Sequence, residues 1–222
     1  MSRYAEHDDW RGECLEASAR KSSTLYDRHE IKYRPYTKVF IGCQIDDPAI
    51  RDRIFKLQQR LIQGTPSARR FLQPLCQLHL TVCTARIDEN QRAKISSSVM
   101  NEAARTCIPD ILFCPDASLR LRGLGQFDDH RVIYVKVDPL NFDLYKLNRS
   151  FAELFGKTSY SLSEYDSYTP HITIFQIRGR LDDRRCIRQT YKQLSEEDID
   201  FGVQRIKNIQ LLDILLPKND CE

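Results

Sequence analysis

Hydrophobic residues along the chain fall into two kinds of pattern. Short runs rich in β-branched and aromatic residues predict strands, and hydrophobic positions three and four residues apart predict amphipathic helices. The predicted strands are 39–45, 75–87, about 111–114, 117–122, 132–137, 171–177 and 203–216. The predicted helices carry the hydrophobic positions within 50–61, 95–103, 140–154 and 187–194. Strands and helices mix along the chain, which favours an α+β fold.

The same order of elements occurs twice. In each half a strand ends in Asp-Pro, a helix and a loop follow, and a second strand carries a histidine. Pro48 precedes His79 by 31 positions, and Pro139 precedes His171 by 32. We interpret this as the duplication of one α+β unit into two lobes around a shared cleft. The predicted boundaries are 37–217 for the domain, about 37–122 for lobe one and about 123–217 for lobe two.

Residues 1–36 are polar and lack hydrophobic periodicity, so we expect a flexible segment ahead of the domain. No apolar run approaches the roughly 20 residues of a membrane helix, and the N-terminal segment contains no stretch of signal-peptide type. We therefore expect no membrane association and a cytoplasmic or nuclear location.

Composition narrows the ways in which the chain could recognise other molecules. The 222 residues include 34 Lys and Arg and 31 Asp and Glu, for a net charge of +3. This balance is too even to hold a long polyanion by counterion release alone, so phosphate recognition must come from a local site. The 8 cysteines contain no C-x2-4-C pair. We expect them to be reduced thiols, and we expect no zinc site.

Two matching motifs stand at equivalent points of the two halves. The first is Leu78-His79-Leu80-Thr81-Val82, and the second is Pro170-His171-Ile172-Thr173-Ile174. In an extended strand alternate side chains share a face, so each histidine lies beside its threonine while the hydrophobic neighbours point into the core. His-x-Thr should occur roughly 0.2 times by chance in this composition, before the flanking hydrophobic residues are required. Two copies in a duplicated frame therefore indicate a functional site.

The residue types in these motifs suit phosphodiester cleavage. Two imidazoles can divide the roles of general base and general acid near neutral pH, and two hydroxyls can donate hydrogen bonds to phosphate oxygens. The sequence leaves open which histidine is the base. No carboxylate stands at ligand spacing within either motif, which disfavours a metal site.

Two other site types are disfavoured. No G-x-S-x-G motif occurs, which disfavours a Ser-His-Asp hydrolase. The glycines in 123–127 are too closely spaced for a dinucleotide fingerprint and precede a strand, so we interpret this segment as a tight turn.

With these motifs the sequence resembles a known family. The two His-Φ-Thr-Φ tetrads, where Φ is hydrophobic, are similar to those of the 2H phosphoesterase superfamily, which includes the 2′–5′ RNA ligase-like (LigT-like) proteins and cyclic phosphodiesterases. The runs YRPYTKVFIGCQI (33–45) and RGLGQFDDHRVIYVKVDP (122–139) look most like the central domain of the A-kinase anchoring protein group. The resemblance covers about residues 33–217. It implies a bilobal duplicated fold, with two antiparallel-sheet lobes and outer helices around a central cleft.

The resemblance also implies an activity and its residues. The expected enzyme is a phosphodiesterase that needs no metal or cofactor and cleaves 2′,5′-linked oligonucleotides such as oligoadenylate, or 2′,3′-cyclic phosphates of RNA. His79 and His171 take the catalytic positions, and Thr81 and Thr173 take the phosphate-binding positions. The alternative is a module that binds an AMP-like nucleotide or an RNA end in the same cleft without turnover.

Two aromatic residues and the end of the chain raise further expectations. Tyr168 lies three positions before His171, and Phe127 lies in the turn that connects the two halves. We expect both near the cleft, where each either stacks a substrate base or packs within the protein. The anchoring proteins carry a kinase-docking helix beyond this domain, but no such helix is evident between Pro217 and Glu222, so kinase anchoring is not carried over.

Overall fold

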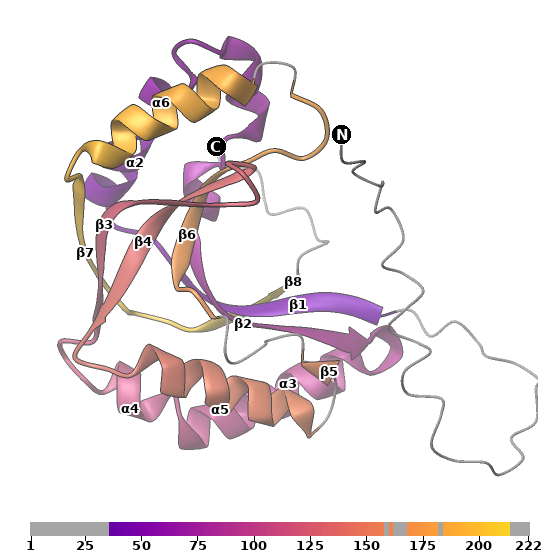
Figure 1. Cartoon of the computed structure of the whole chain (residues 1–222). Helices are drawn as coiled ribbons and strands as arrows, with labels where there is room; N and C mark the ends of the chain where they lie inside the picture. The colour runs from indigo at the N-terminus through magenta and orange to yellow at the C-terminus, as the bar shows by residue number, and fades with distance from the viewer. Residues whose placement is uncertain (1–35, 158–159, 162–167, 182–183, 214–222) are drawn as a thin grey trace, which may run out of the picture. The chain divides into compact units, whose positions relative to one another are not determined.

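A computed structural model of the protein describes residues 36–157, 160–161, 168–181 and 184–213. Within these ranges the strands form two four-stranded antiparallel sheets, with helices packed against both (Figure 1). The predicted α+β class and the two sheet-based lobes are therefore confirmed. The predicted segment 1–36 lies almost wholly outside the described residues.

Each sheet has its own set of four strands. In spatial order, the first sheet consists of β5 (Tyr160–Ser161), β2 (His79–Asp88), β1 (Tyr36–Gln44) and β8 (Gln210–Asp213). The second sheet consists of β6 (His171–Gln176), β4 (Val132–Leu140), β3 (Ser118–Phe127) and β7 (Asp200–Arg205).

The halves of the sequence exchange strands between these sheets. β8, the last described strand, pairs with β1, and β5 from the second half pairs with β2. β3 begins in the first half but pairs with β4 and β7 of the second sheet. The boundary expected between 122 and 123 thus falls inside β3, because strand pairing and not position along the chain decides which sheet a strand joins.

Two crossover helices are exchanged as well. α2 (Pro48–Ile62) follows β1 of the first sheet but packs on β6 and β7 of the second. α5 (Leu144–Gly156) follows β4 of the second sheet but packs on β2 and β5 of the first. Each sheet is therefore covered by a helix that follows a strand of the other sheet (Figure 1).

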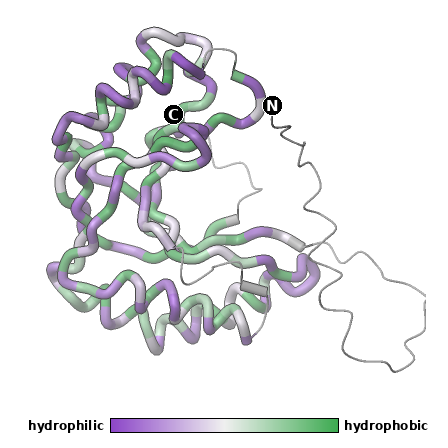
Figure 2. The backbone as a smooth tube through the Cα atoms, in the orientation of Figure 1, coloured by the Kyte–Doolittle hydropathy of each residue, from purple (hydrophilic) through white to green (hydrophobic). Residues whose placement is uncertain are grey.

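Further helices complete the two outer layers. α6 (Arg184–Glu196) packs beside α2, and α3 (Arg92–Thr106) packs beside α5 and the short α4 (Pro109–Leu112). The remaining helical segments are 3-10 turns: η1 (Pro66–Phe71), η2 (Leu75–Gln77) and η3 (Glu89–Gln91). Hydrophobic and hydrophilic positions alternate along helices and strands alike (Figure 2).

Local sequence explains where the crossover helices begin. The Asp47 side chain caps α2 by accepting from the backbone nitrogens of Ala49 and Ile50 at 2.9 and 3.0 Å, and Pro48 occupies the first turn. The predicted hydrophobic face of α2, which includes Ile54, is buried. The second half differs, because β4 continues through the Asp-Pro pair to Leu140 and Asp143 caps α5 instead.

Two predicted strand positions and one predicted turn are wrong. Residues 111–114 overlap a helical turn, because Pro109 presets a helical φ at the start of α4. Residues 75–77 form η2, so β2 begins at His79. Residues 123–127 belong to β3 and are not a tight turn, because the positive φ angles of the hairpin lie at Asp128, Asp129 and His130.

The predicted final strand over 203–216 is also wrong as a single element. It divides into β7 of the second sheet and β8 of the first, separated by 206–209, and its last residues lie outside the described part. One thiol prediction fails too. Cys43 and Cys83 are buried thiols in the strands, but Cys76 is disulfide-bonded and sits in η2, where it cannot pack as a strand residue.

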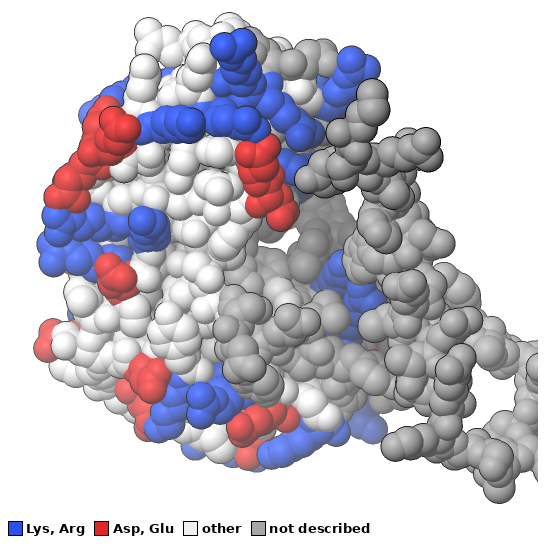
Figure 3. All heavy atoms as spheres, viewed as in Figure 1, with Lys and Arg blue, Asp and Glu red and all other residues white. Residues whose placement is uncertain are grey.

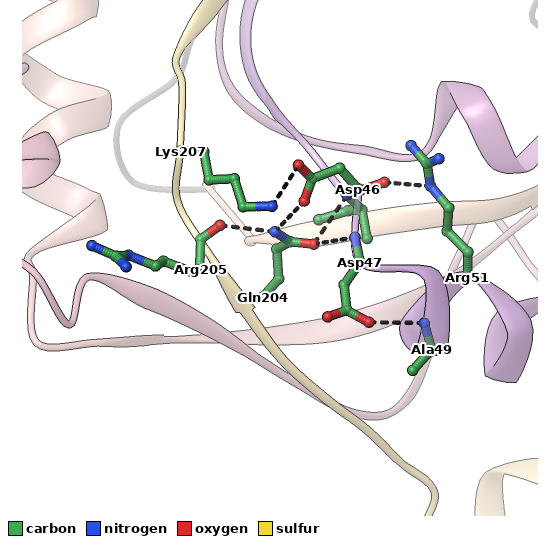
Figure 4. Close-up of polar contacts among 8 residues, drawn as sticks. Asp46, Asp47, Ala49, Arg51, Gln204, Arg205 and Lys207 are labelled. Atoms are coloured by element: carbon green, nitrogen blue, oxygen red, sulfur yellow. Dashed lines mark hydrogen bonds and ion pairs between the residues drawn. The ribbon is translucent and has the colours of Figure 1, made fainter.

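A buried glutamine joins the end of β1 to the end of β7 (Figure 4). The Gln204 Oε1 atom accepts from the backbone nitrogens of Asp46 and Asp47, both at 3.0 Å. Its Nε2 atom donates to the Asp46 carboxylate at 2.7 Å, and the Lys207 Nζ atom meets the other oxygen of that carboxylate at 2.9 Å. This network fixes the point where the chain leaves the first sheet for the second.

Candidate active site

The two predicted tetrads open two equivalent strands. His79 is the first residue of β2, and His171 is the first residue of β6. Leu80 and Ile172 are fully buried, whereas each histidine and its threonine are only half-buried. β2 and β6 also contact each other although they belong to different sheets. The fold therefore brings both predicted pairs, His79 with Thr81 and His171 with Thr173, onto adjoining strands.

Both imidazoles are held by the same kind of backbone contact. The Nδ1 atom of His79 lies 2.7 Å from the carbonyl oxygen of Gln77, and that of His171 lies 2.7 Å from the carbonyl oxygen of Thr169. A carbonyl can only accept, so Nδ1 carries the proton and donates it. This arrangement makes Nε2 the atom that gains or loses a proton in each ring.

A β-bulge follows each threonine at the same place. In the first sheet Ile41 pairs with Cys83 and Gly42 with Thr81, so Val82 is the extra residue. In the second sheet Ile133 pairs with Phe175 and Tyr134 with Thr173, so Ile174 is the extra residue. Bulges bend a strand and re-aim its side chains, and they are common beside active sites.

A buried amide from a crossover helix satisfies the carbonyl of each bulge residue. The Asn148 Nδ2 atom, on α5, donates to the Val82 oxygen at 2.6 Å. The Gln58 Nε2 atom, on α2, donates to the Ile174 oxygen at 2.8 Å. Asn148 is 3% exposed and Gln58 is 2% exposed, so both amides are buried and hydrogen-bonded, and the Gln58 Nε2 atom also donates to the Gln73 carbonyl oxygen at 2.8 Å. The duplication thus extends from the tetrads to the groups that hold them.

Aromatic rings pack against both histidines. The Phe40 ring lies 4.7 Å from that of His79 between centroids, and the Phe127 and Tyr134 rings each lie 5.1 Å from that of His171. Phe127 and Tyr134 are stacked at 4.4 Å. A Cβ atom at Gly125 would come within 2.3 Å of the Tyr134 ring, so only glycine leaves room for this ring. The predicted residue Phe127 is therefore beside His171.

The surroundings of His171 favour its neutral form. Burial lowers the pKa of His171 below its usual value, and the bond to the Thr169 carbonyl opposes this only partly. Lys136 pairs directly with His171 across the strands and is exposed, and Gln44 holds the equivalent position opposite His79. Lys136 thus adds a positive charge on the face that carries the second tetrad.

Tyr168 makes contacts of a packing residue. Its hydroxyl donates to the carbonyl oxygen of Thr81 at 2.9 Å, and its ring meets that of Tyr145 at 5.8 Å. Burial raises the pKa of its phenol. Of the two roles considered for Tyr168, these contacts favour packing, since they join the segment before His171 to the strand of the other tetrad.

Sequence reasoning missed several residues of this site: Phe40, Tyr134, Lys136, Gln58 and Asn148. The first three lie in the site because of how the strands pair, and strand pairing cannot be predicted from the hydrophobic pattern of the sequence. The two amides had a weak signal, because each is a polar residue within the hydrophobic face of a predicted helix.

The described residues form neither a cluster of metal-ligating side chains nor a membrane-spanning helix. In the part of the chain that the structure describes, no three His, Cys, Asp or Glu residues gather as metal ligands would. No described helix combines the length and the apolar character that crossing a membrane requires.

Comparison with known proteins agrees with this geometry. The sequence profile of the AKAP7 2′5′ RNA ligase-like domain matches residues 38–220. No match was found among curated protein sequences.

Solved structures share the fold at low sequence identity. E. coli LigT complexed with ATP has a TM-score of 0.53 at 16% identity, covering 84% of this chain and 92% of LigT. TT0787 of Thermus thermophilus also has a TM-score of 0.53 at 16% identity, covering 78% of this chain and 86% of its own. The MHV ns2 PDE domain has a TM-score of 0.52 at 12% identity, covering 80% of this chain and 99% of that domain.

Proposed function

Because the chain belongs to the AKAP7 2′5′ RNA ligase-like domain family of the 2H phosphoesterases, we propose that it cleaves phosphodiesters by two-histidine acid–base catalysis without a metal or cofactor. The proposed substrates are 2′,5′-linked oligonucleotides such as oligoadenylate, or 2′,3′-cyclic phosphates of RNA. The proposed catalytic residues are His79 and His171, and the proposed phosphate ligands are the Thr81 and Thr173 hydroxyls.

One observation carries this proposal. The two His-Thr pairs open equivalent strands, and each histidine has its Nδ1 proton committed to a carbonyl. Two matched imidazoles that exchange protons at Nε2 suit a reaction that needs one proton removed and one supplied. A site that only binds a nucleotide does not need two imidazoles that are both oriented to exchange a proton at Nε2.

The surroundings of the histidines suggest how the roles are divided. Burial lowers the pKa of His171 and favours its neutral form, so we assign its Nε2 atom as the general base that takes a proton from water or from the 3′-hydroxyl beside a 2′,5′ linkage. The activated oxygen attacks phosphorus, and the bond to the 5′-oxygen breaks. Protonated His79 then gives its Nε2 proton to the departing oxygen. Each proton transfer contributes on the order of 10²–10⁴-fold to the rate.

The test is a product analysis. The protein is incubated with 2′,5′-linked triadenylate, 3′,5′-linked triadenylate and adenosine 2′,3′-cyclic phosphate in excess chelator, and the products are separated by chromatography. We expect the first or third substrate to be cleaved and the 3′,5′-linked control to be spared. His79→Ala and His171→Ala should each lose at least about 100-fold in kcat, with an unchanged melting temperature.

Loss of cleavage on chelation, with recovery on adding zinc or magnesium, would replace this mechanism with a metal-dependent one. Near-normal turnover by either histidine variant would remove that residue from catalysis.

A second candidate is nucleotide binding without turnover. It is favoured by the structures of E. coli LigT complexed with ATP and with 3′-AMP, which are nucleotides of this kind. Calorimetry with AMP separates the two functions, because measurable binding together with no product from any of the three substrates identifies a binding module.

A further inference from the structure

A pocket of about 670 Å³ is lined by the segment 70–77, which precedes β2, and by residues at and after the end of β6. Its wall includes three arginines and three glutamines: Arg70, Arg178, Arg180, Gln73, Gln77 and Gln176. The arginines are exposed, and the glutamines are half-buried.

Two residues of the pocket connect it to the tetrads. Gln77 supplies the carbonyl oxygen that holds the His79 ring. Gln176 ends β6, three residues after Thr173. The pocket therefore adjoins the start of β2 and the end of β6, the two strands that carry the tetrads.

Two of the arginines keep their positive charge available to a ligand. Among the described residues, no Asp or Glu lines the pocket, and neither Arg70 nor Arg178 forms an ion pair. The Arg70 Nη2 atom donates to the Arg180 carbonyl oxygen at 3.0 Å. The Arg178 Nε and Nη2 atoms donate to the Gln176 Oε1 atom at 3.2 and 3.0 Å.

This pattern differs from that of other arginines on the surface. Arg60, Arg120, Arg122 and Arg188 each pair with a carboxylate. Basic and acidic side chains are interspersed on the face seen in Figure 3. Against a net charge of only +3, the guanidinium groups of Arg70 and Arg178 make this pocket a local centre of positive potential.

We propose that this pocket binds a second phosphate group of the substrate, one nucleotide away from the phosphodiester held by the threonines. Guanidinium groups match phosphate oxygens with paired, charge-assisted hydrogen bonds. This inference rests on the proposed function and narrows it. The preferred substrate carries at least two phosphates, as an oligonucleotide or a terminally phosphorylated dinucleotide does, and a lone cyclic mononucleotide leaves the pocket unused.

The first experiment measures binding and needs no turnover. Calorimetry compares adenosine 3′,5′-bisphosphate with 5′-AMP and 3′-AMP for the wild-type protein, Arg70→Gln, Arg178→Gln and the double variant. We expect the bisphosphate to bind about tenfold or more tightly than the better monophosphate, with an advantage that shrinks as salt increases. The double variant should lose this advantage and keep the monophosphate affinity.

Arg69→Gln is the matched control, because Arg69 is exposed on the same 3-10 turn but does not line the pocket. It should leave the bisphosphate advantage unchanged. An equal loss of affinity in this variant would assign the effect to general surface charge and overturn the inference.

The second experiment measures cleavage of 2′,5′-linked diadenylate with and without a terminal phosphate, tested separately at the 5′ and the 3′ end. A phosphate at one end should lower KM in the wild type but not in the double arginine variant. If all substrates are cleaved with equal KM and the bisphosphate shows no advantage, the second subsite is wrong and the proposed function stands. If the bisphosphate advantage is present without cleavage, the subsite stands and the proposed function fails.

Discussion

At the scale of single residues, the candidate active site depends on the hydrogen bonds and the ring contacts of two imidazoles. Each ring is tied by Nδ1 to the carbonyl two residues earlier in the chain. The described ring contacts differ, because Phe40 packs against His79, whereas Phe127 and Tyr134 pack against His171. Identical motifs can thus take different chemical roles when their neighbours differ.

This difference predicts the titration of His171. Because burial disfavours the charged ring, its pKa in the folded protein lies below the unfolded value of about 6.5. The lowered pKa contributes stability that is fully present above about pH 6.5 and is lost as the pH falls through the folded pKa. NMR titration of the ring should give a midpoint below 6.5, and in denaturant the midpoint should return to about that value. If His171 is the base, the acidic limb of kcat/KM follows the same group.

A folded-state midpoint at or above 6.5 would contradict the assignment of His171 as the base. The His171→Ala variant provides the stability control. Its free energy of unfolding should fall less than that of the wild type as the pH decreases through this range.

Gly125 gives a second prediction at this scale. A methyl group there meets the Tyr134 ring at 2.3–2.5 Å, so Gly125→Ala must displace that ring and with it the neighbours of His171. We expect a loss of about 1–3 kcal/mol in unfolding free energy and a lower kcat. Gly156→Ala is the control, because nothing lies within 4 Å of its added methyl group. Equal behaviour of the two variants would show that the Tyr134 ring has no part in positioning His171.

The residues of the site were only partly predictable from the sequence. His79, Thr81, His171 and Thr173 stand out because a motif of four letters recurs at matching places. Phe40, Tyr134 and Lys136 come from β1 and β4, and they approach the tetrads only once strand register is fixed. A one-residue bulge changes that register, and the bulges at Val82 and Ile174 cannot be predicted from these residue types.

At the scale of elements, the crossover helices do more than cover the sheets. α5 presents Asn148 to the bulge of β2, and α2 presents Gln58 to the bulge of β6. α5 follows a strand of the second sheet but supports the tetrad strand of the first, and α2 does the reverse.

We predict that Asn148→Ala and Gln58→Ala destabilise the protein and impair catalysis. A buried carbonyl without its donor costs about 1–3 kcal/mol. We expect similar costs for the two variants. In Gln58→Ala the Ile174 oxygen keeps the Gln73 backbone nitrogen at 2.9 Å, but the Gln73 carbonyl oxygen also loses the Gln58 Nε2 atom at 2.8 Å. Chemical denaturation measures the first effect, and kcat under saturating substrate at a temperature where each variant is fully folded measures the second.

Two outcomes would contradict this reasoning. Equal stability to the wild type would mean that the amides do not satisfy the bulges. A normal kcat in a destabilised but folded variant would limit them to a structural role. Ser150→Ala, a half-buried position on α5 beyond Asn148, is a control for changes to that helix alone.

The elements themselves were well predicted where a periodic hydrophobic face was long. All four predicted helices exist, because burial of one face dominates their energetics. The failures came at short segments, where four residues such as 111–114 have strand composition but Pro109 dictates a helical start. The separation of β7 from β8 depends on tertiary pairing and leaves no local signal.

At the scale of the whole molecule, the two halves are interlocked by exchange. Each sheet receives strands from both halves, and each is covered by a helix that follows a strand of the other. Neither half has a complete sheet of its own, so we expect the described domain to fold as one cooperative unit.

This interlocking decides which terminal deletions the protein tolerates. β1 lies between β2 and β8 in the first sheet, and Val39, Ile41, Cys43 and Ile45 along it or just after it are almost fully buried. Full burial of one such aliphatic side chain contributes about 1.5–3 kcal/mol, and a whole domain is stable by only about 5–15 kcal/mol. Deleting residues 1–45 should therefore abolish the cooperative thermal transition.

Deleting only residues 1–30 should leave activity and melting temperature nearly unchanged, because that segment has no hydrophobic periodicity to bury. Differential scanning calorimetry of both truncated proteins measures the contrast. A fall of more than about 2–4 °C in the shorter deletion corresponds to about 1 kcal/mol at this size. Such a fall would mean that Trp10, Leu15 or Leu25 contributes to the fold and that the predicted domain start is too late. A cooperative transition in the longer deletion would mean that the sheet does not need its central strand.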